Sequence, residues 1–371
     1  AKDLLADGLA GGLPCLDPEA PFQMLYTSGT TGLPKGALLS HRAKLAQGRT
    51  HSRNCALQAG DRVLSALPLY HQFAQWLALV CLPLTGATLV ARATFDAGDW
   101  WSALRNEAIT HLPAVPTLLY RLLEHPATHG PRPPALRQIV YGGAPIDAER
   151  LPALRAVFPG VRFFQGLGQT ESGALTGLHD ADHEQHPYSV GQVDALAEVR
   201  LLDEAGQPVP EGDVGEIVVR SPMLMHGYYK DQEATAAYYA FGREWGRTGD
   251  LARRDAEGFF TLAGRRNELI LSGGVNIYPA EVEQVLRAHP TIAEAAVYGL
   301  PHADWGEEVG ATVVLRAEGA AFDPQALDRW CRERLAAFKC PRRVQVLAEL
   351  PRTASGKVQK WKLADAGRAE Q

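Results

Sequence analysis

The strongest constraint on the fold is a regular alternation of short apolar runs with helical patterns over the first half of the chain. The predicted strands lie at residues 62–67, 87–91, 110–115 and 137–142. The predicted helices lie at about 72–84, 98–107, 116–124 and 147–157. This alternation predicts an α/β layer built on a mostly parallel sheet. An apolar run from Pro21 to Tyr26 predicts a short buried strand ahead of that layer.

The pattern changes after Ser189, where short strands with Gly and Pro punctuation predict an antiparallel, barrel-like section. From about Asn267 onward, helical and strand patterns predict a small α+β domain, in which Asp323 and Pro324 have the pattern of a helix start. A chain of 371 residues exceeds the size at which one core usually stops growing. We therefore expect a large domain over residues 1–266, incomplete at its N-terminus, and a small, mobile one over 267–371.

Composition and charge narrow the class of protein. The formal net charge is −5 and no long basic run is present, which argues against nucleic acid as a partner. The five cysteines are scattered and form no CxxC pair, which indicates a reduced, cytoplasmic protein without a zinc site. The longest apolar region, Trp76 to Leu84, is too short to cross a bilayer, so no transmembrane segment is expected.

The segment YTSGTTGLPKG, from Tyr26 to Gly36, has the composition of a phosphate-binding loop. Glycines let the backbone approach an anion, hydroxyls and amides can donate to it, and a lysine adds a point charge. A flexible, hydroxyl-rich surface turn is the alternative, and the position directly after an apolar strand favours the phosphate loop. The pattern differs from the nucleotide P-loop, because Lys35 is followed by Gly36.

Further motifs follow that loop in a fixed order. They are PLYHQFAQ (68–75), YGGAP (141–145), GQTES (168–172), GEIVVRSP (215–222), GRTGDL (246–251), GRRNELILSGGVNIYPAEVE (264–283) and PRTASGK (351–357). Together with YTSGTTGLPKGALLSH they resemble the adenylate-forming (AMP-binding) superfamily of acyl-CoA synthetases, peptide-synthetase adenylation domains and luciferases. The resemblance covers nearly the whole chain from about residue 21, and the SGGVNIYPAEVE block resembles the acyl-CoA synthetase branch.

The resemblance implies an ATP-dependent carboxylic acid–CoA ligase that requires Mg²⁺ and acts on a fatty or aromatic acid. A carboxylate would attack the α-phosphorus of ATP, and CoA would then take the acyl group from the adenylate. Such a site needs cations and aligned donors more than a general base. Two alternatives stay open: transfer to a carrier protein, and a non-catalytic nucleotide-binding fragment. A homodimer is also left open.

The family motifs imply roles for individual residues. Lys357 would bridge the substrate carboxylate and the ATP phosphates, Thr170 would bind the α-phosphate, and Glu171 would bind Mg²⁺. His71 would separate the ATP and acyl pockets. Asp250 would accept the ribose hydroxyls, beside Arg265. The remaining ATP-binding residues implied by the resemblance are Thr27, Ser28, Gly29, Thr30, Thr31, Gly32, Lys35, Gly143, Ala144, Pro145, Gly168 and Gln169.

Two more sets complete the implied site. The acyl pocket would be lined by His71, Gln72, Phe73, Tyr141, Gly142, Gly143, Gly166, Gly168 and Val190. Its many glycines favour a long or flat apolar acid. The CoA arm would pass Ser272, Gly273 and Gly274, with Lys339, Arg342 and Arg343 near its phosphates. A tight turn at the glycines and a solvated basic edge are the alternatives.

The sequence also departs from the family pattern. The hinge position is Asn267 instead of Asp or Lys, and Leu167 stands where an aromatic residue usually stacks on adenine. Family members carry an extensive section before the phosphate loop, whereas about twenty-five residues precede it here. We therefore expect part of the large domain's packing to be missing from this chain.

Overall fold

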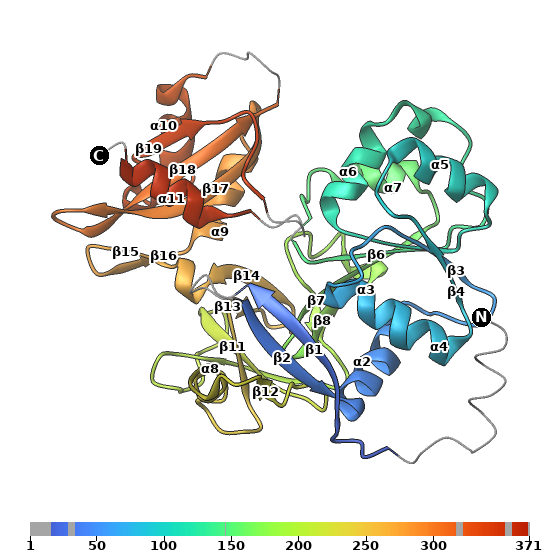
Figure 1. Cartoon of the computed structure of the whole chain (residues 1–371). Coiled ribbons are helices and arrows are strands. Elements are labelled where there is room, and N and C mark those ends of the chain that lie inside the picture. The colour runs from blue at the N-terminus through green and yellow to red at the C-terminus, as the bar shows by residue number, and fades with distance from the viewer. Residues whose placement is uncertain (1–15, 29–33, 145, 317–321, 353–357, 370–371) are drawn as a thin grey trace.

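The computed structural model describes residues 16–28, 34–144, 146–316, 322–352 and 358–369 (Figure 1). Its largest sheet has seven strands in the order β4-β3-β5-β6-β7-β8-β9, parallel from β4 to β7 and antiparallel at β8 and β9. The strands are β3 (Arg62–Ser65), β4 (Thr88–Ala91), β5 (His111–Ala114), β6 (Gln138–Gly142), β7 (Arg162–Gln169), β8 (Gly173–Leu178) and β9 (Gln192–Val193). The predicted α/β class with a mostly parallel sheet is confirmed.

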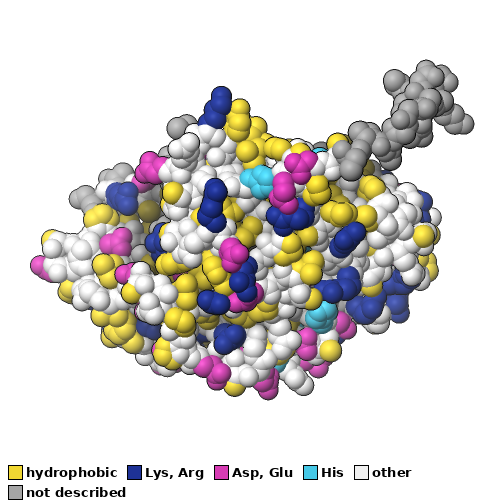
Figure 2. Space-filling model, turned by 90° about the horizontal axis from the view of Figure 1, so that it is seen from below, with side chains coloured by type: hydrophobic (Ala, Val, Ile, Leu, Met, Phe, Trp, Pro, Cys, Tyr) yellow, Lys and Arg dark blue, Asp and Glu magenta, His cyan; other side chains and the backbone are white. Residues whose placement is uncertain are grey.

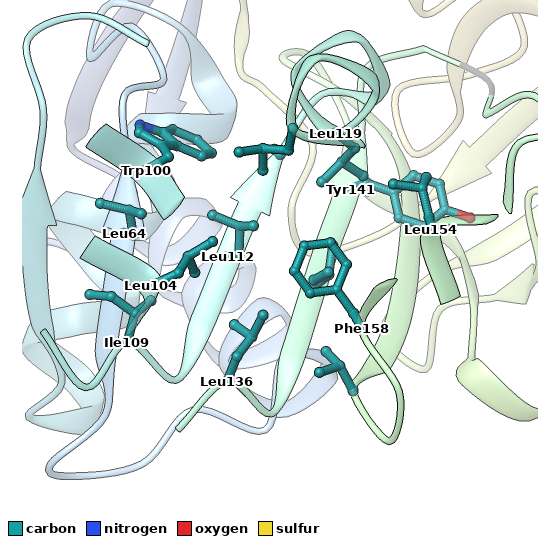
Figure 3. Close-up of a cluster of buried hydrophobic side chains, with 14 of the residues drawn as sticks. Leu64, Trp100, Leu104, Ile109, Leu112, Leu119, Leu136, Tyr141, Leu154 and Phe158 are labelled. Carbon is teal, nitrogen blue, oxygen red and sulfur yellow. The ribbon is translucent and has the colours of Figure 1, made fainter. Parts of the chain in front are cut away.

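Helices cover both faces of this sheet, as parallel sheets require. One face carries α5 (Ala97–Asn106), α6 (Pro116–Glu124) and α7 (Leu151–Val157), and the other carries α2 (His41–Asn54), α3 (Gln72–Trp76), η1 (Leu77–Cys81) and α4 (Leu82–Thr85). Figure 3 shows the first core, where side chains of α5, α6 and α7 pack on β5 and β6. Alternate strand residues supply the two cores: Ile139 and Phe163 face one, Val140 and Phe164 the other.

The large lobe has two further sheets, both antiparallel, and the predicted section after Ser189 supplies all strands of one of them and only β12 (Gly227–Tyr228) of the other. One has the order β10 (Glu198–Leu202), β11 (Gly215–Arg220), β13 (Gly246–Arg254) and β14 (Phe260–Arg265). The other joins β1 (Pro21–Ser28), β2 (Pro34–Ser40) and β12 (Gly227–Tyr228), and α8 (Gln232–Tyr238) follows β12. Strand β12, far along the chain, thus pairs with β2 of the β1–β2 hairpin. The predicted phosphate loop lies between the two strands of this hairpin in the sequence.

The elements from β15 onward form a separate lobe, coloured orange to red in Figure 1. Its sheet has the order β16 (Val275–Ile277), β15 (Ile270–Ser272), β18 (Gly306–Leu315) and β17 (Ile292–His302), and β19 (Arg343–Val346) pairs in parallel with β18. The helices are α9 (Pro279–Arg287), α10 (Pro324–Arg332) and α11 (Lys360–Ala369). The lobe has its own core, from Ile270 to Cys340.

Short helical turns complete the described chain. They are η2 (Pro126–His129), η3 (Asp180–Asp182), η4 (Arg266–Glu268) and η5 (Ala337–Lys339). Side-chain oxygens of Ser40 and Asp323 accept hydrogen bonds from the first turns of α2 and α10, so the predicted start of α10 is confirmed. Within the described residues, no helix combines the length and apolar character needed to cross a membrane. Acidic and basic side chains are interspersed over the face shown in Figure 2.

Three local predictions need correction. The first strand exists, but the prediction that it is buried is wrong. Only Leu25 of its residues from Pro21 to Tyr26 is buried, because β1 is the edge strand of its sheet. The helix predicted at 147–157 begins only at Leu151, after turn residues. The helix predicted at 72–84 contains a π-helical turn, η1. Helix α2 was not predicted.

Candidate active site

A cavity of about 1070 Å³ lies between the two lobes. It is lined on the side of the large lobe by the β1–β2 hairpin, the carboxyl ends of β5, β6 and β7, and residues 170 and 171, which follow β7. Glu294 and residues 349–352 line it on the side of the C-terminal lobe. In sheets of this kind, ligands bind at the carboxyl ends of the parallel strands. The position of the cavity is therefore that of a ligand site.

One wall of the cavity places a lysine near a carboxylate. Thr27 and Lys35 pair across β1 and β2, and the Thr27 hydroxyl lies 3.5 Å from the Lys35 carbonyl oxygen. The Lys35 ammonium lies 5.5 Å from the centre of the Tyr228 ring, and the Tyr228 hydroxyl donates to Glu171 Oε1 at 2.9 Å. Burial, and then Glu171, raise the pKa of Tyr228, so its hydroxyl remains a donor. Lys35 and Glu171, predicted from separate motifs, thus share one part of the site.

Part of the predicted phosphate loop lies outside the described residues. Ser28 ends β1, whereas Gly29, Thr30, Thr31 and Gly32 lie outside the described residues. Thr170 follows β7 and lines the cavity beside Glu171.

A second group of side chains gathers around Asp250. Gln169 Nε2 donates to Asp250 Oδ2 at 2.6 Å and to the Thr248 carbonyl at 2.8 Å. Arg265 Nε lies 3.0 Å from Asp250 Oδ1. Gln169 and Arg265 line the cavity, while Asp250 is buried directly behind them. Three predicted nucleotide-binding residues from different motifs therefore meet at one place.

The cavity suits a magnesium ion held mainly by a nucleotide. Among the residues that the structure describes, no group of three or more His, Cys, Asp or Glu side chains could hold a metal ion alone. Glu171 nevertheless presents a carboxylate to the cavity. Mg²⁺ is usually held by one or two carboxylates, water and substrate phosphates. Glu171 together with bound phosphates fits that requirement.

The predicted acyl pocket is largely assembled around α3 and the ends of β6 and β7. The His71 ring accepts a hydrogen bond from the Phe73 amide at 3.2 Å and so caps α3. A Cβ added to Gly142 would lie 2.5 Å from the Gly166 carbonyl oxygen, so this approach of β6 to β7 requires glycine. The predicted residues that line the cavity here are His71, Gln72, Phe73, Tyr141, Gly142, Gly143, Gly166 and Gly168.

Apart from the CoA-binding set, four predicted residues that the structure describes are not among those lining the cavity: Ser28, Ala144, Val190 and Asp250. Val190 is buried in another core, with its amide bonded to the Phe260 carbonyl. Ala144 is exposed and is not among the lining residues. Pro145 lies outside the described residues.

The predicted CoA residues lie away from the cavity, on the C-terminal lobe. Gly273 and Gly274 form the turn between β15 and β16, with φ of 57° and 80°, as a tight two-residue hairpin requires. Ser272 ends β15. Lys339 is paired with Glu281 at 2.6 Å, and the Arg342 guanidinium lies 3.8 Å from the centre of the Trp305 ring. Arg343 lies 2.7 Å from a Glu308 oxygen.

The start of the C-terminal lobe and a segment that precedes α11 border the cavity. Asn267, the predicted hinge, belongs to η4 and lines the cavity. Lys357 lies outside the described residues, but Pro351 and Arg352, at the start of the same motif, line it. The first two residues of the PRTASGK motif thus lie at the site.

Sequence reasoning missed several lining residues. His51 and Asn54 come from α2, Trp76 from α3 and Tyr228 from β12. The signal on α2 was present as polar residues spaced three and four apart, the spacing of one helix face. No local signal marks Tyr228, because β12 is only two residues long and reaches the site through its pairing with β2.

The fold and the cavity define a two-lobed enzyme in which residues of both lobes line one site. The sequence profile of the AMP-binding enzyme family matches residues 6–229, and that of the AMP-binding enzyme C-terminal domain matches residues 281–357. The chain belongs to the AMP-binding enzyme family.

Known proteins of this family resemble the chain over most of its length. A sulfoacetate–CoA ligase of Cupriavidus necator is 39% identical over 355 residues, which are 95% of this chain and 69% of that protein. A feruloyl-CoA synthase of an Amycolatopsis species is 39% identical over 370 residues, covering 95% and 72%. The solved structure of an amide bond synthetase from Marinactinospora thermotolerans superposes with a TM-score of 0.88 at 34% identity, covering 96% and 72%.

Proposed function

We propose that this chain is an AMP-forming carboxylic acid–CoA ligase that uses ATP and Mg²⁺. The observation that carries the proposal is the single cavity that joins the Lys35–Tyr228–Glu171 wall, the Asp250–Arg265–Gln169 group and the pocket beside α3. A triphosphate, a ribose and an acyl group each find matching chemistry in these three parts. The CoA ligase relatives support the same activity.

In the first half-reaction, the residues of the site act by positioning and by charge. Lys35, Thr27 and Thr170 would hold the phosphates, and Asp250 would accept the ribose hydroxyls. Mg²⁺, held by Glu171 and the phosphates, would offset negative charge as pyrophosphate leaves. Lys357 would bring the carboxylate to the α-phosphorus, since Pro351 and Arg352 already lie at the cavity. Carboxylate is already a nucleophile, so no general base is needed.

The second half-reaction needs another arrangement of the lobes. Gly273, Gly274 and the nearby basic residues do not line the cavity in this structure. We propose that the lobe beyond the 266/267 boundary rotates about Asn267 after adenylation and brings the Gly273–Gly274 turn to the acyl-adenylate. The glycines would then leave room for the pantetheine arm.

The acceptor and the acid are tested together. The protein is supplied with ATP, Mg²⁺ and a panel of fatty, aromatic and short anionic acids, and release of AMP and pyrophosphate is measured with and without CoA. Acyl-CoA formation for at least one acid is the expected result. If adding CoA does not increase the release of pyrophosphate, the result would favour transfer to a carrier protein. ATP binding without an adenylate for any acid would favour a nucleotide-binding fragment. Cytoplasmic location and a homodimer remain predictions.

A further inference from the structure

The buried face of α2 is unusual because it is polar. Lys44, Gln47, His51 and Asn54 follow one another at intervals of three and four residues, so they share one face of the helix. Lys44 and Gln47 are at most 1% exposed. A helix packed on a sheet normally turns an apolar stripe inward. A polar stripe in this position, reaching the acyl side of the cavity, therefore calls for a function.

Most of the stripe is satisfied by the protein itself. Lys44 Nζ donates to Gln72 Oε1 at 3.3 Å, and Gln72 Nε2 donates to Gln47 Oε1 at 2.6 Å. Asn54 Nδ2 donates to Asp194 Oδ2 at 2.9 Å. His51 is the exception: its ring lines the cavity, and no hydrogen bond to it occurs within the described part of the chain. Of the stripe residues that line the cavity, His51 is thus the one whose side chain has no hydrogen-bond partner among the described residues.

The position of the His51 ring is fixed by stacking. It lies 4.1 Å from the Trp76 ring at an interplanar angle of 17°, and Phe73 stacks on Trp76 at 5.5 Å and 21°. All three rings line the cavity. A Cβ at Gly48 would lie 2.2 Å from a Val80 methyl group, so α2 packs closely against η1, the π-helical turn that follows Trp76. Such π turns often occur at functional sites.

The charge state of His51 selects the kind of group it can bind. Burial, and then the positive charge of Lys44, lower the pKa of His51 to about 3. The imidazole is therefore neutral near pH 7, with one nitrogen that donates and one that accepts. Such a ring can form a hydrogen bond with a hydroxyl or a carbonyl oxygen, and His51 does not have to be protonated for that bond to form.

The shape of this end of the cavity suits a flat group. The stacked rings of Phe73 and Trp76 form one side, and Tyr141 and Phe164 also line the cavity. Gly142 and Gly166 present no side chain at the adjoining strand ends. Aromatic walls with a floor of glycine leave a space for a planar ring.

We infer that the acyl substrate is a planar aromatic acid with a hydroxyl or carbonyl oxygen at the end remote from its carboxylate, and that His51 is the specificity-determining residue that binds this oxygen. The inference rests on the proposed ligase function and names the substrate class of the same site. His51 has no part in the transfer of the acyl group.

The test pairs each aromatic acid with its analogue that lacks the remote oxygen, for example 4-hydroxycinnamate with cinnamate. The variant His51→Phe keeps a ring to stack on Trp76 and removes both nitrogens. Arg53→Gln, at an exposed position of the same helix, is the matched control. For the wild type we expect kcat/KM for the hydroxylated acid to exceed that for its analogue by about tenfold or more. In His51→Phe this preference should fall to about twofold or less, chiefly by loss on the hydroxylated acid.

Three results would overturn the inference: an equal loss on both acids, which indicates a structural role; a wild-type preference for the analogue; or a preference for fatty or short anionic acids. If no acid leads to release of AMP, that result would contradict the proposed ligase function instead. In that case calorimetry with the paired acyl-sulfamoyl adenosines, which mimic the adenylate and do not react, still decides the inference. A ratio of Kd values near one for the wild type would refute it, and the tenfold ratio would support it.

Discussion

Arg265 faces Asp250 across the β13–β14 pair, with 3.0 Å between Nε and Oδ1. Arg265 is also the last residue of β14, and η4, which contains the predicted hinge Asn267, follows it directly. The ion pair therefore lies both at the proposed ribose site and two residues from the proposed hinge. A nucleotide that engages Asp250 would contact the large lobe at the point where the chain leaves it.

The first prediction concerns Asp250. Asp250→Asn keeps the size of the side chain and removes its charge, so the ribose hydroxyls and Arg265 lose a charged acceptor. Because hydrogen bonds to charged groups contribute about 1.5–3 kcal/mol, the KM for ATP should rise by about ten- to a hundredfold. Steady-state kinetics with varied ATP measure this. Asp213→Asn, in an exposed loop, should leave the KM unchanged, and an unchanged KM in Asp250→Asn would remove Asp250 from the ribose site.

The second prediction separates the half-reactions at Lys357. Lys357→Ala removes the charge proposed to bridge the carboxylate and the phosphates, so adenylate formation should be abolished. Thioester formation from supplied acyl-adenylate should stay largely intact. Single-turnover assays of each half-reaction measure this, with Lys362→Ala, at an exposed position of α11, as the control. Equal loss of both half-reactions would contradict the role.

The third prediction makes the opposite separation at Gly274. Gly274 has a φ of 80°, and nothing lies within 4 Å of an added Cβ. Gly212 is a matched control, because its φ is 82° and its surroundings are equally open. Alanine at either position should cost about 1–2 kcal/mol of folding free energy through backbone strain. Only Gly274→Ala should slow acyl transfer to CoA, with adenylation unchanged. Similar rates of acyl transfer to CoA in the two variants would show that Gly274 only forms the turn and does not bind CoA.

Short-range patterns sufficed for four of the five parallel strands, β3 to β6, and for the residues that meet at the cavity. Strand β7 was missed, because Gln165 and two glycines interrupt its apolar run. The other four strands could be predicted because each is a compact apolar run, largely buried in β3, β5 and β6 and partly exposed in the edge strand β4. Gln169, Asp250 and Arg265 could be predicted because each belongs to a local motif. The exposure of β1 was not readable, since an edge strand has the same apolar composition as a central one. The contribution of Tyr228 depends on a two-residue strand that pairs with β2 far away in the sequence. The proximity of Arg265 to Asp250 likewise depends on strand register, which no single motif contains.

The fourth prediction concerns the attachment of α11 to the hinge. Lys360 Nζ lies 2.7 Å from Glu283 Oε1 and 2.9 Å from Glu268 Oε2, and Glu268 follows Asn267 directly. Burial lowers the pKa of Lys360, but the two carboxylates outweigh burial and raise it. Lys360→Met leaves both carboxylates without this cation, so unfolding of the C-terminal lobe should become easier by about 3 kcal/mol.

Denaturant titration, together with limited proteolysis near η4, measures this effect. Lys362→Met, on the exposed side of the same helix, should change neither readout. If Lys360→Met unfolds like the wild type and is cleaved no faster, the ion pairs of Lys360 with Glu268 and Glu283 do not stabilise the C-terminal lobe.

The last prediction is a pH dependence of stability that arises at His111. The ring is 2% exposed, and its Nε2 lies 2.9 Å from the Cys55 carbonyl oxygen. Burial is the main cause that lowers its pKa to about 4, and Arg162 adds to the effect, although Asp61 Oδ2 lies 3.7 Å from Nδ1. As the pH falls, the unfolded chain, in which a histidine has a pKa of about 6.5, therefore takes up a proton before the folded chain does.

The free energy of unfolding should consequently fall as the pH drops below about 6.5, and this contribution should level off below about 4. When the pH falls from about 7.5 to about 5.5, His111 should lower the free energy of unfolding by about 1 kcal/mol. In His111→Gln, which can still donate to the Cys55 carbonyl, that part of the dependence should disappear. Urea titrations of both proteins at several pH values give the comparison. Parallel stability curves for the two proteins would show that His111 binds its proton equally in the folded and unfolded chains, against the burial seen in the structure.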